Sequence, residues 1–283
     1  MFRDDLLTGK RILVTGGGTG LGRAMAARFL ALGAAVVLCG RREDVLQETA
    51  AAFDETQPGR TTWHACDIRD AQAVDAMLDA VWAEAPLNGL VNNAAGNFIA
   101  RTETLSPRAV DAIVNIVLHG TAYVTLGCGK RWIERGDPAT VLSIVTTYAW
   151  TGSAYVVPSA MAKAGALAMT RSLAVEWGPR GVRLNAIAPG PFPTPGAWDR
   201  LVPRPDLARS IETQNPLGRV GEHHELADLA SYLMADGSGY INGEVVTIDG
   251  GEWIQGAGQF SFLRDAVSDA DWEEMRSRGR KGG

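Results

Sequence analysis

The chain has 283 residues, a length that suits one large domain or two small ones. Its composition is 46% hydrophobic and 21% charged, which supports a compact core and excludes a disordered polymer. The net charge of -5 argues against nucleic acid as the main partner, because nucleic-acid binders usually carry a basic excess.

Short apolar runs alternate along the chain with longer alanine-rich stretches. The runs predict buried parallel strands at Ile12–Val14, Ala35–Cys39, Thr61–Cys66, Gly89–Val91, Val141–Val145, Val182–Ile187 and Val245–Ile248. The stretches between them predict helices at Leu21–Leu32, Glu43–Phe53, Ala71–Ala85, Pro107–Glu134, Pro158–Trp177 and Glu222–Met234. This alternation is typical of the α/β class, in which a doubly wound sheet of about seven parallel strands is flanked by helices.

The chain shows no linker and no break in composition, so residues 1–283 are predicted to form a single domain. Two regions lack a regular pattern. Gly190–Asp206 is rich in proline and glycine and is too interrupted for a long helix. From Glu252 onward a C-terminal tail mixes glycine, aromatic and charged residues, and a helix is predicted at Asp269–Arg278.

The cysteines and the apolar runs indicate in which cellular compartment the protein is expected. Cys39, Cys66 and Cys128 form no paired-cysteine motif and no metal-ligand spacing, so we expect neither a disulfide framework nor a metal site. No uninterrupted apolar run reaches about 18 residues, so we expect no membrane span. A strand is predicted soon after Met1, which leaves no room for a targeting peptide, and the expected location is the cytoplasm.

A glycine-rich turn, TGGGTGLG at residues 15–22, follows the first predicted strand and opens the first helix. Glycines let the backbone approach a pyrophosphate, and a helix N-terminus supplies free N–H groups and a positive dipole end. A glycine motif alone could be an ordinary turn. Its place between a strand and a helix predicts a dinucleotide site at Gly16, Gly17, Gly18, Thr19, Gly20 and Leu21.

The end of the second predicted strand distinguishes the two nicotinamide cofactors. An acidic residue there would bind the ribose 2′-hydroxyl and repel a 2′-phosphate, whereas this chain has Gly40-Arg41-Arg42. Arg41 beside a small residue favours the phosphate and therefore NADPH; the alternative is a pair of solvated arginines at a helix start. Asp67, after the third strand, is placed to accept from the adenine amino group, or else to cap the next helix.

Four segments together resemble the short-chain dehydrogenase/reductase family. They are TGGGTGLG (15–22), NNAAG (92–96), VNIVLHGT around Asn115, and RLNAIAPGP (183–191). The resemblance covers almost the whole chain. It implies a Rossmann-like sheet of seven parallel strands and a homotetramer.

The chain departs from that family's catalytic signature, which is a serine followed by Y-x-x-x-K on the next helix. Lys163 matches the lysine, but Ser159 stands where the tyrosine is usual and Thr146 where the serine is usual. Tyr148 lies two residues after Thr146. With NNAAGNF (92–98) and PGPFPTPGAWDRL (189–201), this arrangement resembles the 2,4-dienoyl-CoA reductase branch.

The resemblance implies NADPH-dependent reduction of a 2,4-dienoyl-CoA to a 3-enoyl-CoA, with fatty-acid β-oxidation as the setting. Tyr148 and Asn97 would donate to the thioester oxygen of a dienolate, and Lys163 would hold the nicotinamide ribose. Ser159, one helical turn before Lys163, would bond the nicotinamide region or a water. The nicotinamide carboxamide would contact Pro189, Gly190, Pro191 and Phe192, and the acyl-CoA would contact Arg69, Phe98, Ser106 and Arg200.

Plainer interpretations stand beside these roles. Tyr148 could be a core aromatic residue, Asn97 could be a loop residue, and Ser159 could simply begin a helix. The three polar residues assigned to acyl-CoA could be ordinary surface residues; they are Arg69, Ser106 and Arg200. The rival activities are a trans-2-enoyl-CoA reductase and a carbonyl reductase that uses Tyr148 as proton donor. The alternative that is not an enzyme is a catalytically silent module that binds NADP(H). The absence of a tyrosine at position 159 motivates it.

Overall fold

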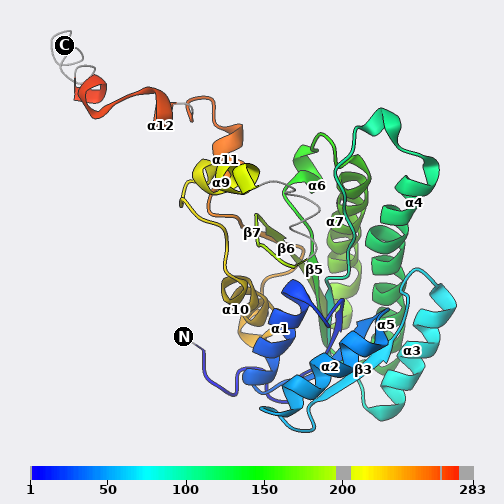
Figure 1. The fold of residues 1–283 in the computed structure, drawn as a ribbon. Coiled ribbons are helices and arrows are strands. Elements are labelled where there is room, and N and C mark those ends of the chain that lie inside the picture. The colour runs from blue at the N-terminus through cyan, green and yellow to red at the C-terminus, as the bar shows by residue number, and fades with distance from the viewer. Residues whose placement is uncertain (1, 196–204, 262, 274–283) are drawn as a thin grey trace.

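The computed structural model describes residues 2–195, 205–261 and 263–273, which build one open sheet of seven parallel strands (Figure 1). The strand order is β3-β2-β1-β4-β5-β6-β7. The strands are β1 Arg11–Thr15, β2 Ala35–Gly40, β3 Thr61–Ala65, β4 Gly89–Asn92, β5 Ala139–Ile144, β6 Val182–Pro189 and β7 Val245–Ile248. The predicted α/β fold class and its seven strands are confirmed. The winding direction changes between β1 and β4, and ligands bind at such a point, outside the carboxyl ends of the strands.

Helices cover both faces of the sheet (Figure 1). One face is covered by α1 Gly20–Ala31, α2 Glu43–Asp54 and α10 His223–Met234, and the other by α3 Ala71–Glu84, α5 Thr121–Arg135 and α7 Val157–Trp177. We call the buried apolar residues under α1, α2 and α10 the first core cluster, and those under α3, α5 and α7 the second. Neighbouring strand residues point to opposite faces, so Ile12 and Val14 join the first cluster while Leu13 joins the second. Burial on both faces explains why the strands read as continuous apolar runs.

The helix predicted at Pro107–Glu134 has a widened turn in its middle. The structure has α4 Pro107–Val114, then a π-helical segment η2 Asn115–Gly120, then α5. A Cβ on Gly120 would lie 2.6 Å from a side-chain carbon of Ile68, so the helix passes very close to the loop after β3. Periodicity did not reveal the π turn, because the apolar spacing on either side of it is helical.

On length and composition, Pro107–Arg135 is also long and apolar enough to cross a membrane, with a mean hydropathy of 1.4 in its most apolar window. This helix contains interspersed polar residues, so it is not the uninterrupted apolar run that the sequence was searched for. Core helices of soluble proteins pass the same test, and here α5 packs Val124, Cys128 and Trp132 into the second core cluster. Only 33% of the window is buried, which leaves apolar side chains on its outer face.

Several short helices were not predicted. They are η1 Thr102–Thr104, α6 Tyr148–Thr151, η3 Gly178–Arg180, α9 Pro205–Gln214, η4 Asp236–Ser238, α11 Glu252–Ala257 and α12 Leu263–Ala266. The tail helix predicted at Asp269–Arg278 is helical at 269–273, and its remainder lies outside the described residues. From α11 the C-terminal segment leads away from the body of the molecule (Figure 1).

Candidate active site

The glycine-rich turn joins β1 to α1 at the carboxyl edge of the sheet. Gly16 has a φ of 66°, a left-handed value that favours glycine, and its N–H donates to the Cys39 carbonyl at 2.7 Å. A Cβ on Gly22 would lie 2.3 Å from the Gly16 carbonyl oxygen, so the helix can approach the turn only without a side chain there. Thr19, the N-cap residue, makes no side-chain capping bond, which leaves the first N–H groups of α1 available to an anion.

Thr15, the first residue of the glycine motif, and Asn93, from the segment after β4, hold this turn in place. The Thr15 hydroxyl accepts from the backbone N–H groups of Asn93 and Ala94 at 3.0 and 3.1 Å. The Asn93 side-chain amide donates to the Thr15 carbonyl at 3.0 Å. The link ties the carboxyl end of β4 to the end of β1. Neither residue was singled out from the sequence, although the NNAAG segment was the signal that could have found Asn93.

The predicted adenosine end lies where β2 and β3 end. Arg41 is exposed, as expected for a side chain that would meet a phosphate. The Asp67 carboxylate pairs with the Arg69 guanidinium, and Arg69 Nε lies 2.9 Å from each carboxylate oxygen. Hydrogen bonds from Arg69 lower the pKa of Asp67, and the charge of Arg41 adds to this effect. The alternative that Asp67 caps the next helix is wrong, since Asp70 accepts from the first N–H groups of α3.

Three of the predicted catalytic residues meet at the carboxyl edge of the sheet. The Asn97 amide nitrogen donates to the Tyr148 hydroxyl at 3.1 Å, and that hydroxyl lies 3.1 Å from the Ser159 hydroxyl. The three side chains come from the loop after β4, from α6 and from the first turn of α7. Asn97 is fixed by its own Oδ1, which accepts from the Phe98 N–H at 2.9 Å. The second N–H of the Asn97 amide, and the Tyr148 hydroxyl hydrogen when Ser159 donates to that hydroxyl, are the donors that remain for an acceptor placed beside the pair.

Lys163 lies one turn after Ser159 on the same helix and is 9% exposed. Its ammonium donates to the carbonyl of Ile144, the last residue of β5. In the described part of the chain no carboxylate pairs with it, and burial lowers the pKa of Lys163 to about 8. A buried cation with one backbone acceptor retains donors for hydroxyl groups of a ligand.

The segment after β6 reaches from the sheet to the glycine-rich turn. Gly190 donates its N–H to the Ile248 carbonyl at 2.9 Å, and Phe192 is buried in the first core cluster. Farther along, a Cβ on Gly20 would lie 3.2 Å from the Thr194 side chain. The predicted nicotinamide segment is therefore anchored beside β7 and ends against the predicted pyrophosphate turn. Thr194 was not among the predicted residues, and only the folded chain shows this contact.

The residues predicted to contact acyl-CoA are spread over the same edge. Phe98 is half-buried and packs against a small apolar cluster that includes Ile113 and Val117. The exposed Ser106 hydroxyl accepts from the Ala109 N–H at 3.3 Å and caps α4. Arg69 is paired as described above, and Arg200 lies outside the described residues. The arrangement offers an anion site, two convergent neutral donors, a buried cation and an apolar wall, which suits a phosphorylated cofactor beside an acyl substrate.

The chain is similar to known reductases and short-chain dehydrogenases. A family model described as enoyl-(acyl carrier protein) reductase matches residues 16–252. A Caenorhabditis elegans protein named probable 2,4-dienoyl-CoA reductase 3 [(3E)-enoyl-CoA-producing] is 42% identical, over 100% of this chain and 94% of that protein. A Bacillus subtilis protein named probable 2,4-dienoyl-CoA reductase [(2E)-enoyl-CoA-producing] is 41% identical, over 87% and 97% respectively. The crystal structure of a Bacillus anthracis short-chain dehydrogenase aligns with a TM-score of 0.81 at 41% identity, covering 88% of this chain and 98% of that one.

Proposed function

The chain belongs to the short-chain dehydrogenase/reductase family and is an oxidoreductase that uses a nicotinamide cofactor, and from this premise we propose that it reduces 2,4-dienoyl-CoA thioesters with NADPH. The observation that carries the proposal is the contact of the Tyr148 hydroxyl with the Asn97 amide at 3.1 Å. Two neutral donors on one point suit a thioester oxygen that gains negative charge. Relatives named 2,4-dienoyl-CoA reductases at 41% and 42% identity support the choice of substrate.

The proposed chemistry assigns a separate task to each side chain. NADPH, when bound, supplies a hydride to the far end of the conjugated diene. Charge then moves to the thioester oxygen, where the Tyr148 hydroxyl and the Asn97 amide donate hydrogen bonds to the dienolate. Ser159, 3.1 Å from the Tyr148 hydroxyl, fixes the orientation of that hydroxyl. A water molecule protonates the carbon next to the thioester, which leaves a 3-enoyl-CoA.

Lys163 and the segment after β6 are proposed to hold the nicotinamide half of the cofactor. The Lys163 ammonium is buried beside the carboxyl end of β5, where it would donate to the ribose hydroxyls. Pro189, Gly190, Pro191 and Phe192 would contact the carboxamide side of the ring. This assignment is supported by the contact of Thr194 with Gly20, which brings the segment to the uncapped N-terminus of α1.

NADPH rather than NADH is proposed from the charges at the ends of β2 and β3. Arg41 is exposed beside Gly40, and no acidic residue follows β2 directly. Asp67 would accept from the adenine amino group with one edge of its carboxylate while Arg69 holds the other. Arg69 would then reach the acyl-CoA only by leaving Asp67. Phe98 supplies the apolar wall for the acyl chain, and Ser106 borders the same region.

We also propose a homotetramer in the cytoplasm. The outer faces of α5 and α7 expose Leu126, Met161 and Val175, and Val175 is 80% exposed. Apolar side chains on two adjacent helices favour burial against further copies, as in a homotetramer. The cysteines are free thiols, which persist in a reducing cytoplasm. Both core clusters lie on one sheet, which supports residues 1–283 acting as one domain.

The test is an NADPH-oxidation assay with a 2,4-dienoyl-CoA, a trans-2-enoyl-CoA and a simple ketone, followed by identification of the products by NMR. We expect turnover of the dienoyl-CoA and a product whose double bond lies between carbons 3 and 4. A 2-enoyl product would show that the proton is delivered to carbon 4 and would refute the water-delivery step at carbon 2. Turnover of the enoyl-CoA or ketone alone would refute the substrate, and NADPH binding without turnover would indicate a silent module.

A further inference from the structure

The segment after β6 is bound by residues that lie about 30 positions later in the chain. The Gly221 N–H donates to the Pro191 carbonyl at 2.9 Å, and His223 Nε2 lies 2.7 Å from the Pro193 carbonyl oxygen. These two bonds attach residues 191–193 to the turn that precedes α10 and to the first residue of that helix. We call residues 219–225 the clasp.

A steric contact adds to the two hydrogen bonds. A Cβ on Gly221 would lie 2.3 Å from the nearest ring carbon of Phe192, so the ring lies directly on the backbone of the clasp. The Phe192 ring is 9% exposed and therefore has little room to move away. Any displacement of the clasp is transmitted to Phe192 by contact.

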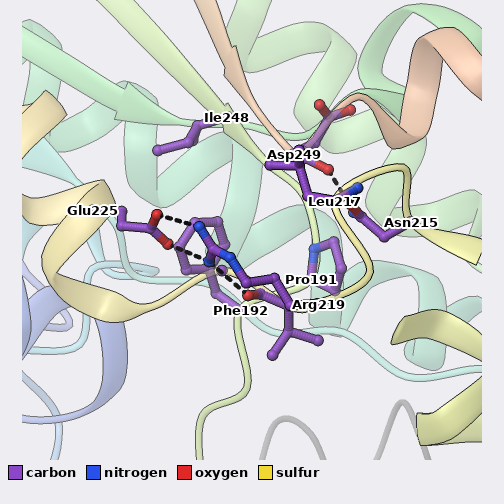
Figure 2. Close-up of a pocket in the computed structure, with 11 residues that line it drawn as sticks. Pro191, Phe192, Asn215, Leu217, Arg219, Glu225, Ile248 and Asp249 are labelled. Carbon is purple, nitrogen blue, oxygen red and sulfur yellow. Dashed lines mark hydrogen bonds and ion pairs between the residues drawn. The ribbon is translucent and has the colours of Figure 1, made fainter. Parts of the chain in front are cut away.

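An ion pair holds the clasp in shape (Figure 2). Arg219 donates to the two carboxylate oxygens of Glu225 at 2.6 and 2.8 Å, and also to the Val220 carbonyl at 3.1 Å. The Glu225 carboxylate accepts in addition from the Glu222 N–H at 2.8 Å and forms half of a capping box at the start of α10. Hydrogen bonds from Arg219 lower the pKa of Glu225 to about 2, so the pair is charged at neutral pH.

A cavity of about 90 Å³ lies between the clasp and the segment after β6. Figure 2 shows Arg219 and Glu225 beside Phe192 at one end of it, with Asn215 and Asp249 at the other. Asn215 donates its side-chain amide to the Asp249 carbonyl at 2.7 Å and so closes that end. The cavity leaves part of the inner side of the segment after β6 unpacked. The position of that segment therefore depends on the contacts at the two ends of the cavity.

We propose that Arg219 and Glu225 are positioning residues for the nicotinamide end of the cofactor, acting through Gly221 on Phe192. They touch no reacting atom. The ion pair keeps the clasp in the shape that places Phe192 and its neighbours against the carboxamide. This inference rests on the proposed function, because that function puts the nicotinamide against Pro189–Phe192.

The experiment compares two ligands by isothermal titration calorimetry on the full chain. NADPH has the nicotinamide, whereas adenosine 2′,5′-bisphosphate has only the adenosine end and its 2′-phosphate. Glu225→Gln keeps an acceptor for the capping box but removes the charge that Arg219 binds. We expect the dissociation constant for NADPH to rise about fivefold and that for the bisphosphate to change less than about twofold. In the double variant with Phe192→Leu, the loss should be smaller than the sum of the two single losses.

A matched control removes a comparable ion pair elsewhere. Arg135 Nε lies 2.6 Å from Asp137 Oδ2 in the connection before β5, at the amino edge of the sheet. Asp137→Asn should change neither dissociation constant. Gly221→Ala is the stronger perturbation, with circular dichroism and thermal unfolding to confirm that it folds.

The outcomes separate the inference from the proposed function. Equal weakening of both ligands by Glu225→Gln, or no weakening of NADPH, would overturn the positioning role. A wild-type protein that binds NADPH but reduces no dienoyl-CoA would overturn the proposed substrate while leaving the two-ligand comparison valid. A wild-type protein that does not bind NADPH would overturn both.

Discussion

The hydroxyl of Tyr148, not that of Ser159, is predicted to be essential for catalysis. Tyr148→Phe removes one of two donors aimed at the thioester oxygen and changes the volume of the side chain very little. Loss of one such donor typically costs about 2.7–4 kcal/mol of transition-state stabilisation, or about two to three decades in turnover. Because the Asn97 amide stays in place, we expect the lower end, about a hundredfold.

The neighbouring variants make the prediction specific. Asn97→Ala should cost a similar factor, because it removes the other donor. In the double variant the losses should be less than additive, since both donors serve one oxygen and lie 3.1 Å apart. Ser159→Ala removes only a partner of the Tyr148 hydroxyl, so its cost should be about 1 kcal/mol, which is about fivefold.

The assay is steady-state NADPH oxidation with a dienoyl-CoA, with NADPH affinity measured separately for each variant. A loss in kcat without a matching loss in NADPH affinity is the expected signature of a donor that acts on the dienolate. Full activity in Tyr148→Phe together with an inactive Ser159→Ala would refute the assignment, and would mean that position 159 still carries the essential group.

Four further outcomes are expected. Burial lowers the pKa of Lys163 to about 8, so its charge is present below that pH and is lost above it. NADPH affinity, measured by calorimetric titration, should therefore fall about tenfold by pH 9. The Lys163→Arg variant, which stays charged, should not show this fall. Gly40→Asp with Arg41→Ala should shift preference towards NADH in a comparison of kcat/KM, since a Cβ on Gly40 meets Leu46 no closer than 3.5 Å. Light scattering should show a tetramer, and Val175→Arg, at an exposed position, should give smaller species without loss of helicity. Ser159→Tyr should produce no strong ketone reduction in the same oxidation assay, because Tyr148 already occupies the space beside position 159.

The fold was predictable because its strands are buried on both faces and therefore appear as uninterrupted apolar runs. Ile12, Leu13 and Val14 illustrate this, since all three are fully buried although they face different helices. The short helix α6 was not predicted, because a four-residue helix has no room for a periodic pattern. The π turn at η2 was missed for a related reason: one widened turn leaves the apolar spacing of its neighbours unchanged.

The site was predictable only where a motif or a resemblance named the residue. The glycine-rich turn was predictable because its residues are consecutive in the sequence and form a recognisable motif. Thr194 against Gly20, and Phe192 against Gly221, join positions about 170 and 30 residues apart in the sequence, and no local pattern encodes such pairs. Asp67 and Arg69 were predicted for separate ligands, yet the spacing i, i+2 after a strand lets their opposite charges meet.

The position of the tyrosine changes what its hydroxyl can do. A phenol at position 159 would lie one helical turn from the Lys163 ammonium, whose charge would favour the phenolate and so suit proton transfer to a ketone. Tyr148 instead comes from α6 and accepts from the Asn97 amide, a neutral donor that stabilises a phenolate less than an ammonium would. The resulting pair suits an oxygen that acquires charge and keeps it until a carbon is protonated. The carbon, rather than the oxygen, then receives the proton, and this is the chemical difference between reducing a conjugated thioester and reducing a ketone.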